Sequence, residues 1–322
     1  MRTVKAISPS SLHTFETDRE LFYSRYLSEA PRVWQSQSAP AIVGSSFDAM
    51  VKCKLYRDLF GNTGGGEYRT EAMFDRQCEN VELRQWAWYA GQWVFECYKD
   101  YGLYHELLME LSKSDVDPKF EFSATGEIEG VPIKGKPDLW YKRDVGVTYD
   151  WKVNGYCTKS AISPKKLYRR CRDCWPKGIA KPTRGGGQPR AHPKYVETEY
   201  KGHLIGEHCM SHSDKRWADQ LCIYELMQGE PGVVGIDQIA CKPGDDKPLI
   251  RVAQHRCRIS DEYRESVITR LKSCWEIIQS GHIFDDMTRE KSDSCCEVLD
   301  MPQPEDDEDG FWAACTERQY RG

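Results

Sequence analysis

The sequence predicts an α/β (α+β) fold in which a central mixed β-sheet is flanked by helices. Apolar residues recur at helical spacing through the first hundred residues, and again over 217–227 and 261–279. Over 119–152 and 233–257 they follow strand-like patterns. The 322 residues, 39% hydrophobic and 30% charged, can form a buried core and differ from the composition of a disordered chain.

The N-terminal part is predicted to be helical. Ser8-Pro9 marks the start of a first helix that runs to about residue 27. Gly44-Ser45-Ser46 opens a second helix, and after a glycine-rich break at 61–66 we expect one long aromatic helix over 68–101.

The predicted sheet is built from five segments. Strands are expected at 119–125, 133–140, 145–152, 233–241 and 249–257, with a turn near Gly130. We expect a single domain over 1–284, interrupted by a basic, irregular insertion at 154–212 and followed by an acidic, flexible tail at 285–322.

Charge is distributed unevenly along this chain. Residues 152–216 contain 15 Lys and Arg against five acidic residues, a local net charge of +10, whereas the whole chain carries −5. A basic segment in an acidic protein suggests a polyanion as partner, most often nucleic acid. A solvated loop with its lysines facing water would have the same composition and is the alternative.

Three residues on two neighbouring strands form the candidate chemical site. Asp150 and Lys152 are two residues apart on one strand and therefore share a face, and Asp138 is expected across from them on the adjoining strand. Two carboxylates beside an ammonium group suit Mg²⁺ or Mn²⁺, which can lower the pKa of a water molecule and stabilise phosphoryl charge. Asp-x-Lys alone is more often found in cross-strand ion pairs on a surface hairpin.

The ordered set of motifs resembles the PD-(D/E)XK nuclease superfamily, in its RecB-like and phage-exonuclease branch. The similarity runs through Ser8-Pro9-Ser10, Gly44-Ser45-Ser46-Phe47-Asp48, Gly135-Lys136-Pro137-Asp138, Asp150-Trp151-Lys152 and Gln220-Leu221-Cys222-Ile223-Tyr224. Together these motifs span residues 7–228, about two-thirds of the chain. The resemblance implies a restriction-endonuclease-like core.

The resemblance also implies a role for each matching residue. The metal ligands would be Asp48, Glu121, Asp138, Asp150 and the backbone carbonyl of Trp151. The catalytic set would be Asp138, Asp150 and Lys152, braced by Gln220 and Tyr224 on one helix face. Iron–sulfur members of the branch carry a cysteine in the first helix; this chain has Phe15-Glu16-Thr17-Asp18-Arg19 there, so we expect no iron–sulfur cluster.

The basic insertion raises a separate question about zinc. Cys171 and Cys174 form a C-x-x-C pair, and His208 and His212 follow at a compatible spacing, so a structural Zn²⁺ site is one hypothesis. Loop cysteines and histidines without a metal are the alternative. Basic residues interleave with Tyr168 and Trp175 in the same insertion, as a DNA-binding surface would require; they are Lys165, Lys166, Arg169, Arg170 and Arg172.

The sequence thus predicts a Mg²⁺- or Mn²⁺-dependent deoxyribonuclease acting on double- or single-stranded DNA, first of all a phage-type exonuclease in recombination, replication or repair. A structure- or sequence-specific endonuclease or nickase, and a catalytically silent nucleic-acid-binding protein, remain alternatives. A single-strand annealing or binding protein is the expected partner. Scattered cysteines, no apolar signal core and no membrane-length apolar run lead us to expect a cytoplasmic protein, in a bacterial host if the chain is phage-encoded.

Overall fold

The computed structural model describes residues 2–30, 37–62, 66–78, 82–100, 102–154, 198–200, 203–207, 215–242 and 249–284. Two compact units divide the chain, Met1–Glu276 and Ile277–Gly322, and every strand belongs to the first. The predicted domain boundary at 284 stays a prediction.

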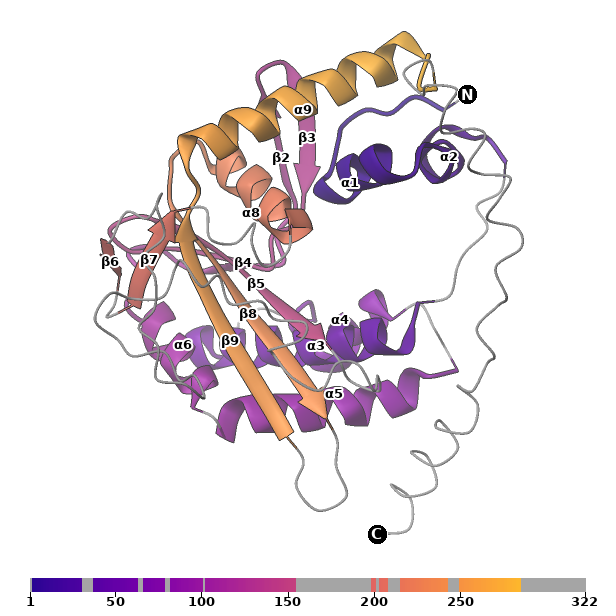
Figure 1. Ribbon diagram of the computed structural model, residues 1–322. Coiled ribbons are helices and arrows are strands. Elements are labelled where there is room, and N and C mark those ends of the chain that lie inside the picture. The colour runs from indigo at the N-terminus through magenta and orange to yellow at the C-terminus, as the bar shows by residue number, and fades with distance from the viewer. Residues whose placement is uncertain are drawn as a thin grey trace, which may run out of the picture. The chain divides into compact units, whose positions relative to one another are not determined.

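Helices form most of the first hundred residues and return near the end of the first unit (Figure 1). A π-helical segment at Tyr23–Leu27 follows the second helix directly. The helices are α1 (Pro9–Thr17), α2 (Arg19–Phe22), α3 (Ala39–Phe60), α4 (Thr70–Gln77), α5 (Arg84–Asp100), α6 (Leu103–Leu111), α8 (Lys215–Gln228) and α9 (Asp261–Ser280).

The strands form a seven-stranded mixed sheet and a separate hairpin. The order in the sheet is β1-β4-β5-β8-β9-β7-β6, and β5–β8 and β7–β9 are its parallel pairs. The predicted central mixed sheet flanked by helices is confirmed. The strands are β1 (Lys119–Phe120), β2 (Ala124–Ile128), β3 (Val131–Gly135), β4 (Leu139–Lys142), β5 (Gly146–Asn154), β6 (Thr198–Tyr200), β7 (His203–Glu207), β8 (Val233–Lys242) and β9 (Leu249–Arg258).

The two faces of β5 have different partners. Tyr149 and Trp151 lie on one face with their rings 5.3 Å apart. Helix α3 contacts β5, and the Tyr98 hydroxyl of α5 donates at 2.6 Å to Oδ2 of Asp237, the β8 residue paired with Trp151. Asp150 on the opposite face accepts a hydrogen bond from α8. At this strand the sheet therefore lies between α8 on one side and α3 with α5 on the other, as Figure 1 shows.

Several predicted elements are wrong in their boundaries. The aromatic stretch forms two helices, α4 and α5, instead of one, and the second helix begins at Ala39, before Gly44, with a proline in its first turn. The strand expected at 119–125 is broken at Glu121, whose φ is 49°. The strand expected at 133–140 breaks at Pro137, since proline cannot donate to a ladder, so β3 and β4 lie in different sheets.

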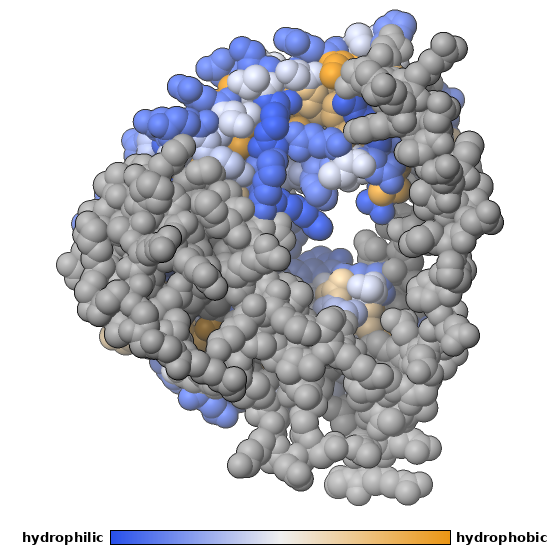
Figure 2. Space-filling model, viewed as in Figure 1, coloured by the Kyte–Doolittle hydropathy of each residue, from blue (hydrophilic) through white to orange (hydrophobic). Residues whose placement is uncertain are grey.

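Three further observations concern the cysteines, the length of the helices and the hydropathy of the surface. Within the described part of the chain the cysteines Cys53, Cys78, Cys97, Cys222, Cys257 and Cys274 are free thiols. Of the helices in the described ranges, none is long and apolar enough to cross a bilayer. On the face shown in Figure 2, the described residues around α8 and the first-unit part of α9 are mainly hydrophilic.

Close packing of α3 against α5 depends on a glycine. A Cβ at Gly91 would lie 2.3 Å from Ser46 Oγ and 2.8 Å from the Phe47 nitrogen. We expect Gly91→Ala to lower the free energy of unfolding by about 1–3 kcal/mol, because the overpacking exceeds the gain in helix propensity. Urea unfolding measures this, and Gly126→Ala, where a Cβ meets nothing within 4 Å, should be close to neutral. Equal stability of both variants would contradict the tight α3–α5 contact.

Candidate metal and active site

The β4–β5 hairpin brings the predicted aspartates together. Leu139 pairs with Tyr149 in this antiparallel ladder, so Asp138, directly before β4, continues the register opposite Asp150. Pro137 lies in the connection between β3, which ends at Gly135, and β4, and the Asp138 carbonyl accepts from the Glu121 N–H at 2.9 Å. The expected juxtaposition of Asp138 and Asp150 follows from this pairing.

Lys152 is held by two groups on the same face. Its Nζ donates to Asp150 Oδ2 at 2.8 Å and to Gln220 Oε1 at 3.2 Å. Gln220 Nε2 closes the triangle by donating to Asp150 Oδ2 at 2.9 Å. The ammonium group is thus fixed at the side of the carboxylate pair, with its side chain 22% exposed.

A second lysine lies inside the acidic cluster. Lys52 Nζ is 2.6 Å from Asp48 Oδ2 and 2.8 Å from Asp138 Oδ1, and it also contacts Glu121 Oε2. One oxygen from each of these three carboxylates lies within 4.8 Å of the others, so the cluster could hold a divalent metal ion. Lys52 itself is fully buried.

Glu121 reaches this cluster through an unusual backbone conformation. Its φ of 49° places a non-glycine residue in the left-handed region directly after β1, at a cost of about 1–2 kcal/mol. Gln77 Nε2 donates to Glu121 Oε2 at 3.2 Å and to Asp48 Oδ2 at 2.8 Å. Lys136 Nζ donates to Glu121 Oε1 at 2.5 Å. These contacts hold Glu121 in a conformation that the isolated chain would rarely adopt.

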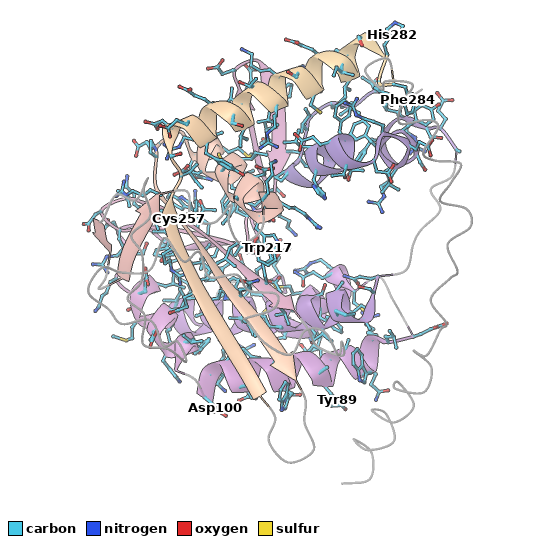
Figure 3. The ribbon with its side chains drawn as sticks, viewed as in Figure 1. Tyr89, Asp100, Trp217, Cys257, His282 and Phe284 are labelled. Carbon is cyan, nitrogen blue, oxygen red and sulfur yellow. The ribbon has the colours of Figure 1, made fainter. Side chains whose placement is uncertain are left out.

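Helix α8 brings Gln220 to the site because its other side is anchored. Figure 3 labels Trp217 near the start of α8, and Gln220 follows one helical turn later. Asp219 accepts from Arg270 Nη2 at 2.6 Å, and Glu225 accepts from Arg264 Nε at 3.1 Å, both arginines being on α9. Tyr224 packs against Gly135, where a Cβ would lie 2.4 Å from its ring, so glycine is required there.

Nearby lysines lower the pKa of two carboxylates, those of Asp138 and Glu121. Burial alone would raise the pKa of Asp138, but the charge of Lys52 and further contacts lower that pKa to about 2. For Glu121, burial is likewise outweighed by Lys52 and Lys136, which lower its pKa. Burial would lower the pKa of Lys52, but the charges of Asp138, Asp48 and Glu121 raise it well above the ordinary value, so the group is a permanent cation.

The other two carboxylates hold protons more tightly than usual. Burial, together with the charges of Asp138 and Glu121, raises the pKa of Asp48 to about 7 despite Lys52. Burial and the neighbouring charge of Asp138 raise the pKa of Asp150 well above its ordinary value. These shifts arise first from burial and then from negative charge that Lys52 and Lys152 do not fully compensate.

One atom of the site indicates where a further cation fits. Asp150 Oδ1 is buried, Asp150 being only 1% exposed, and no donor of another residue reaches it, so Asp150 can bond to the neighbouring Asp138 carboxylate only through a proton. A buried carboxylate oxygen without a donor is costly, and a hard divalent cation would satisfy it. Asp138 and Asp150 supply the oxygen ligands that Mg²⁺ or Mn²⁺ prefers, so the residues present fit the predicted ion.

A cavity of about 570 Å³ opens beside the aspartates. Gln220 and Tyr224 line it together with hydroxyl and cationic side chains, and the N-terminal end of α1 faces it through Ser8 and Ser10. The Lys134 N–H donates to the Ile7 carbonyl at 2.8 Å, which fixes that end of α1 against β3. The remaining lining includes Ser123, Thr125, Lys134, Lys136 and Arg216. This chemistry favours an anionic ligand.

Several predicted site residues lie outside the described part of the chain. They are Cys171, Cys174, His208, His212, Lys165, Lys166, Arg169, Arg170 and Arg172, so the zinc hypothesis and the basic DNA-binding surface stay predictions. The Trp151 carbonyl stays a predicted metal ligand; the Trp151 side chain is buried on the opposite face from Asp150.

Sequence reasoning missed two residues of the site, Lys52 and Gln77. Lys52 had a recognisable signal, because it lies in the otherwise apolar stretch 49–53 of a helix and four residues after Asp48. A lysine at such a position needs buried acidic partners. Gln77 had no comparable signal, since its neighbours in sequence resemble an ordinary amphipathic helix.

Comparisons with known proteins give distant structural likenesses. No family model and no curated protein matches the chain. Among solved structures, a protein from Eubacterium rectale named "Putative exonuclease" is similar over 93% of this chain and 90% of its own, with 15% identity and a TM-score of 0.42. The protein SSO0001 is similar over 87% of this chain and 95% of its own, with 12% identity and a TM-score of 0.25. Neither likeness establishes a shared fold.

The raised pKa of Asp48 predicts a pH-dependent stability in the absence of divalent ions. Between about pH 4 and 7 the folded chain keeps a proton on Asp48 that the unfolded chain has lost, so the free energy of unfolding falls as pH rises through this window. Asp48→Asn removes that titration. Over the window the free energy of unfolding of this variant should fall by about 2–4 kcal/mol less than that of the wild type, since one pKa unit corresponds to about 1.4 kcal/mol.

Urea unfolding in EDTA between pH 4.5 and 8 measures the difference. Asp115→Asn, a change at an exposed aspartate outside the cluster, serves as the control and should follow the wild type. Parallel pH profiles for Asp48→Asn and the wild type would show that Asp48 titrates normally.

Proposed function

We propose that this protein is a Mg²⁺- or Mn²⁺-dependent nuclease that hydrolyses phosphodiester bonds of DNA. The observation that carries the proposal is the buried, unpartnered Asp150 Oδ1 beside Asp138, with the Lys152 ammonium group held at the edge of the pair. Buried carboxylate oxygens that serve only a structural ion pair usually have a donor. The ordered motifs that resemble PD-(D/E)XK nucleases support the same assignment.

Asp138, Asp150 and the Trp151 carbonyl would hold the divalent ion. The ion would supply Lewis-acid stabilisation of the charge that develops on the phosphoryl oxygens. Asp138, with its lowered pKa, is ionised at every pH at which the protein would act. Asp150 would give up its proton when the cation binds, because the cation replaces the proton as the partner of its buried oxygen.

Lys152 would orient the attacking water and stabilise the negative charge of the transition state. Lys152 would stay protonated: burial lowers its pKa, but the charges of Asp150 and Asp138 raise it above the ordinary value. Gln220 would keep the ammonium group in place, since the Gln220 amide bonds both Lys152 and Asp150. Electrostatic groups that are fixed before the reaction need no reorganisation during it.

The adjacent cavity would receive the DNA backbone. Its hydroxyl groups and the side chains of Lys134 and Arg216 can donate to phosphate oxygens, and the N-terminal end of α1 adds a favourable dipole. Gln220 and Tyr224 belong both to this cavity and to the aspartate site. A strand bound in the cavity would therefore present a neighbouring phosphodiester to Asp138 and Asp150.

Exonuclease action is our first choice, because the motifs resemble those of the RecB-like and phage-exonuclease branch. The expected role is in phage recombination, replication or repair. Endonuclease or nickase action and binding without cleavage are outcomes of the same experiment. Incubation with Mg²⁺ or Mn²⁺ on linear and covalently closed circular DNA separates them. Loss of linear DNA alone identifies an exonuclease, nicking of circles an endonuclease, and no cleavage of either contradicts the proposal.

Substitutions at the site should distinguish the residues needed to bind the ion from those needed only for cleavage. Asp150→Asn should abolish ion binding and lower cleavage at least ~100-fold, and Lys152→Met should lower cleavage to a similar extent while the ion still binds. DNA binding in EDTA should persist in both. Asp144→Asn, at the opposite end of the same hairpin, is the matched control and should cleave normally. Normal cleavage by Asp150→Asn would rule out this site.

The cavity makes a separate prediction about DNA affinity. Lys134→Gln with Arg216→Gln should weaken binding and reduce the slope of log affinity against log salt by about 1.4–1.8, if each side chain neutralises one phosphate. Lys113→Gln, at an exposed position outside the cavity, is the control. Fluorescence anisotropy over a salt series measures the slopes, and an unchanged slope would place the DNA backbone elsewhere.

A further inference from the structure

We propose that the Lys52 ammonium group occupies a second cation position next to the active site, so that the protein binds a single divalent ion. This inference rests on the proposed function. It assigns to Lys52 a positioning role that the sequence motifs do not include, because none of them contains this residue.

The contacts of Lys52 are those of a bound cation. Its Nζ has three donors, and it contacts three carboxylates, those of Asp48, Glu121 and Asp138. The same three carboxylates form the cluster that could hold a metal ion. The ammonium group therefore lies among the ligands that a divalent ion would otherwise share.

Burial fixes Lys52 in this position. Its side chain is 0% exposed and lies within the buried stretch Ala49–Cys53 of α3. Leaving the cluster would either bury the ammonium group without acceptors or force the helix to open, and both are costly. The group is thus a permanent part of the site.

The oxygens around Lys52 are also satisfied by other donors. Gln77 Nε2 donates to Asp48 Oδ2 and Glu121 Oε2, and Lys136 Nζ donates to Glu121 Oε1. By contrast, Asp150 Oδ1 has no donor. A divalent ion would therefore bind between Asp138 and Asp150, and Asp138 would face both positions.

The charges are consistent with one divalent ion. Four carboxylates with side chains at most 24% exposed contribute −4 when ionised, and Lys52 and Lys152 contribute +2; these carboxylates belong to Asp48, Glu121, Asp138 and Asp150. One Mg²⁺ would neutralise the remaining −2. Lys136, 55% exposed, is screened by solvent and changes this balance little. A second divalent ion would make the cluster positive.

Lys52 would act through its neighbours and not on the substrate. It is buried behind the carboxylates and would not reach a bound phosphate, but its contact with Asp138 Oδ1 fixes one oxygen of that ligand. It would also keep Asp138 and Glu121 ionised. Lys52 is therefore a positioning residue for the ion site.

Mn²⁺ binding to the full-length protein tests the inference without measuring cleavage. Equilibrium titration followed by electron paramagnetic resonance should give one Mn²⁺ per wild-type chain, with the spectrum of an isolated ion. Lys52→Ala removes the resident charge and leaves room for a cation, so this variant should bind two Mn²⁺ ions with a dipole-coupled spectrum. Lys54→Ala, an exposed change on the same helix, should bind one.

A double variant identifies the two positions. Lys52→Ala with Asp150→Ala should bind one Mn²⁺, held by Asp48, Glu121 and Asp138, whereas Asp150→Ala alone should bind none. Two ions in the wild type, or one ion in Lys52→Ala with unchanged affinity, would overturn the role of Lys52 and leave the proposed function standing. No ion in the wild type would overturn the proposed function itself. If Lys52→Ala does not fold, two ions in the wild type would still overturn the role of Lys52.

Discussion

Charge compensation among buried carboxylates is the constraint on which the site depends. Four acidic side chains converge where β1, β4 and β5 meet α3, and two lysines neutralise only half of their formal charge. Burial, followed by the charge of the neighbouring carboxylates, raises the pKa values of Asp48 and Asp150, and Asp150 Oδ1 has no donor from another residue. A bound divalent cation would lower both pKa values and give Asp150 Oδ1 a partner.

The fold holds these charges together through backbone features that are separate from the charges themselves. The β4–β5 register aligns Asp138 with Asp150, and the left-handed conformation of Glu121 turns its carboxylate toward Lys52. Ion pairs between α8 and α9 place Gln220 beside Lys152. Strain and polar burial are thus concentrated at the site, as is common where structure serves chemistry.

Local sequence patterns were sufficient for the elements that carry most of the site. The alternation at Asp150 and Lys152 and the helix with Gln220 and Tyr224 lie as expected, and the pairing of Asp138 with Asp150 follows from a short hairpin. Contacts between residues far apart in the sequence could not be predicted from local patterns. Lys52 meets Asp138 across 86 positions, and Gln77 meets Glu121 across 44, so neither contact has a local pattern. The break at Glu121 depends on the same tertiary contacts.

The most direct test of the account is an anomalous difference map from crystals of the protein grown with Mn²⁺. We predict one peak per chain, between the carboxylates of Asp138 and Asp150, with Lys52 still in contact with Asp48, Glu121 and Asp138. The absence of a peak between Asp138 and Asp150, or a peak in the place of the Lys52 ammonium group, would contradict it.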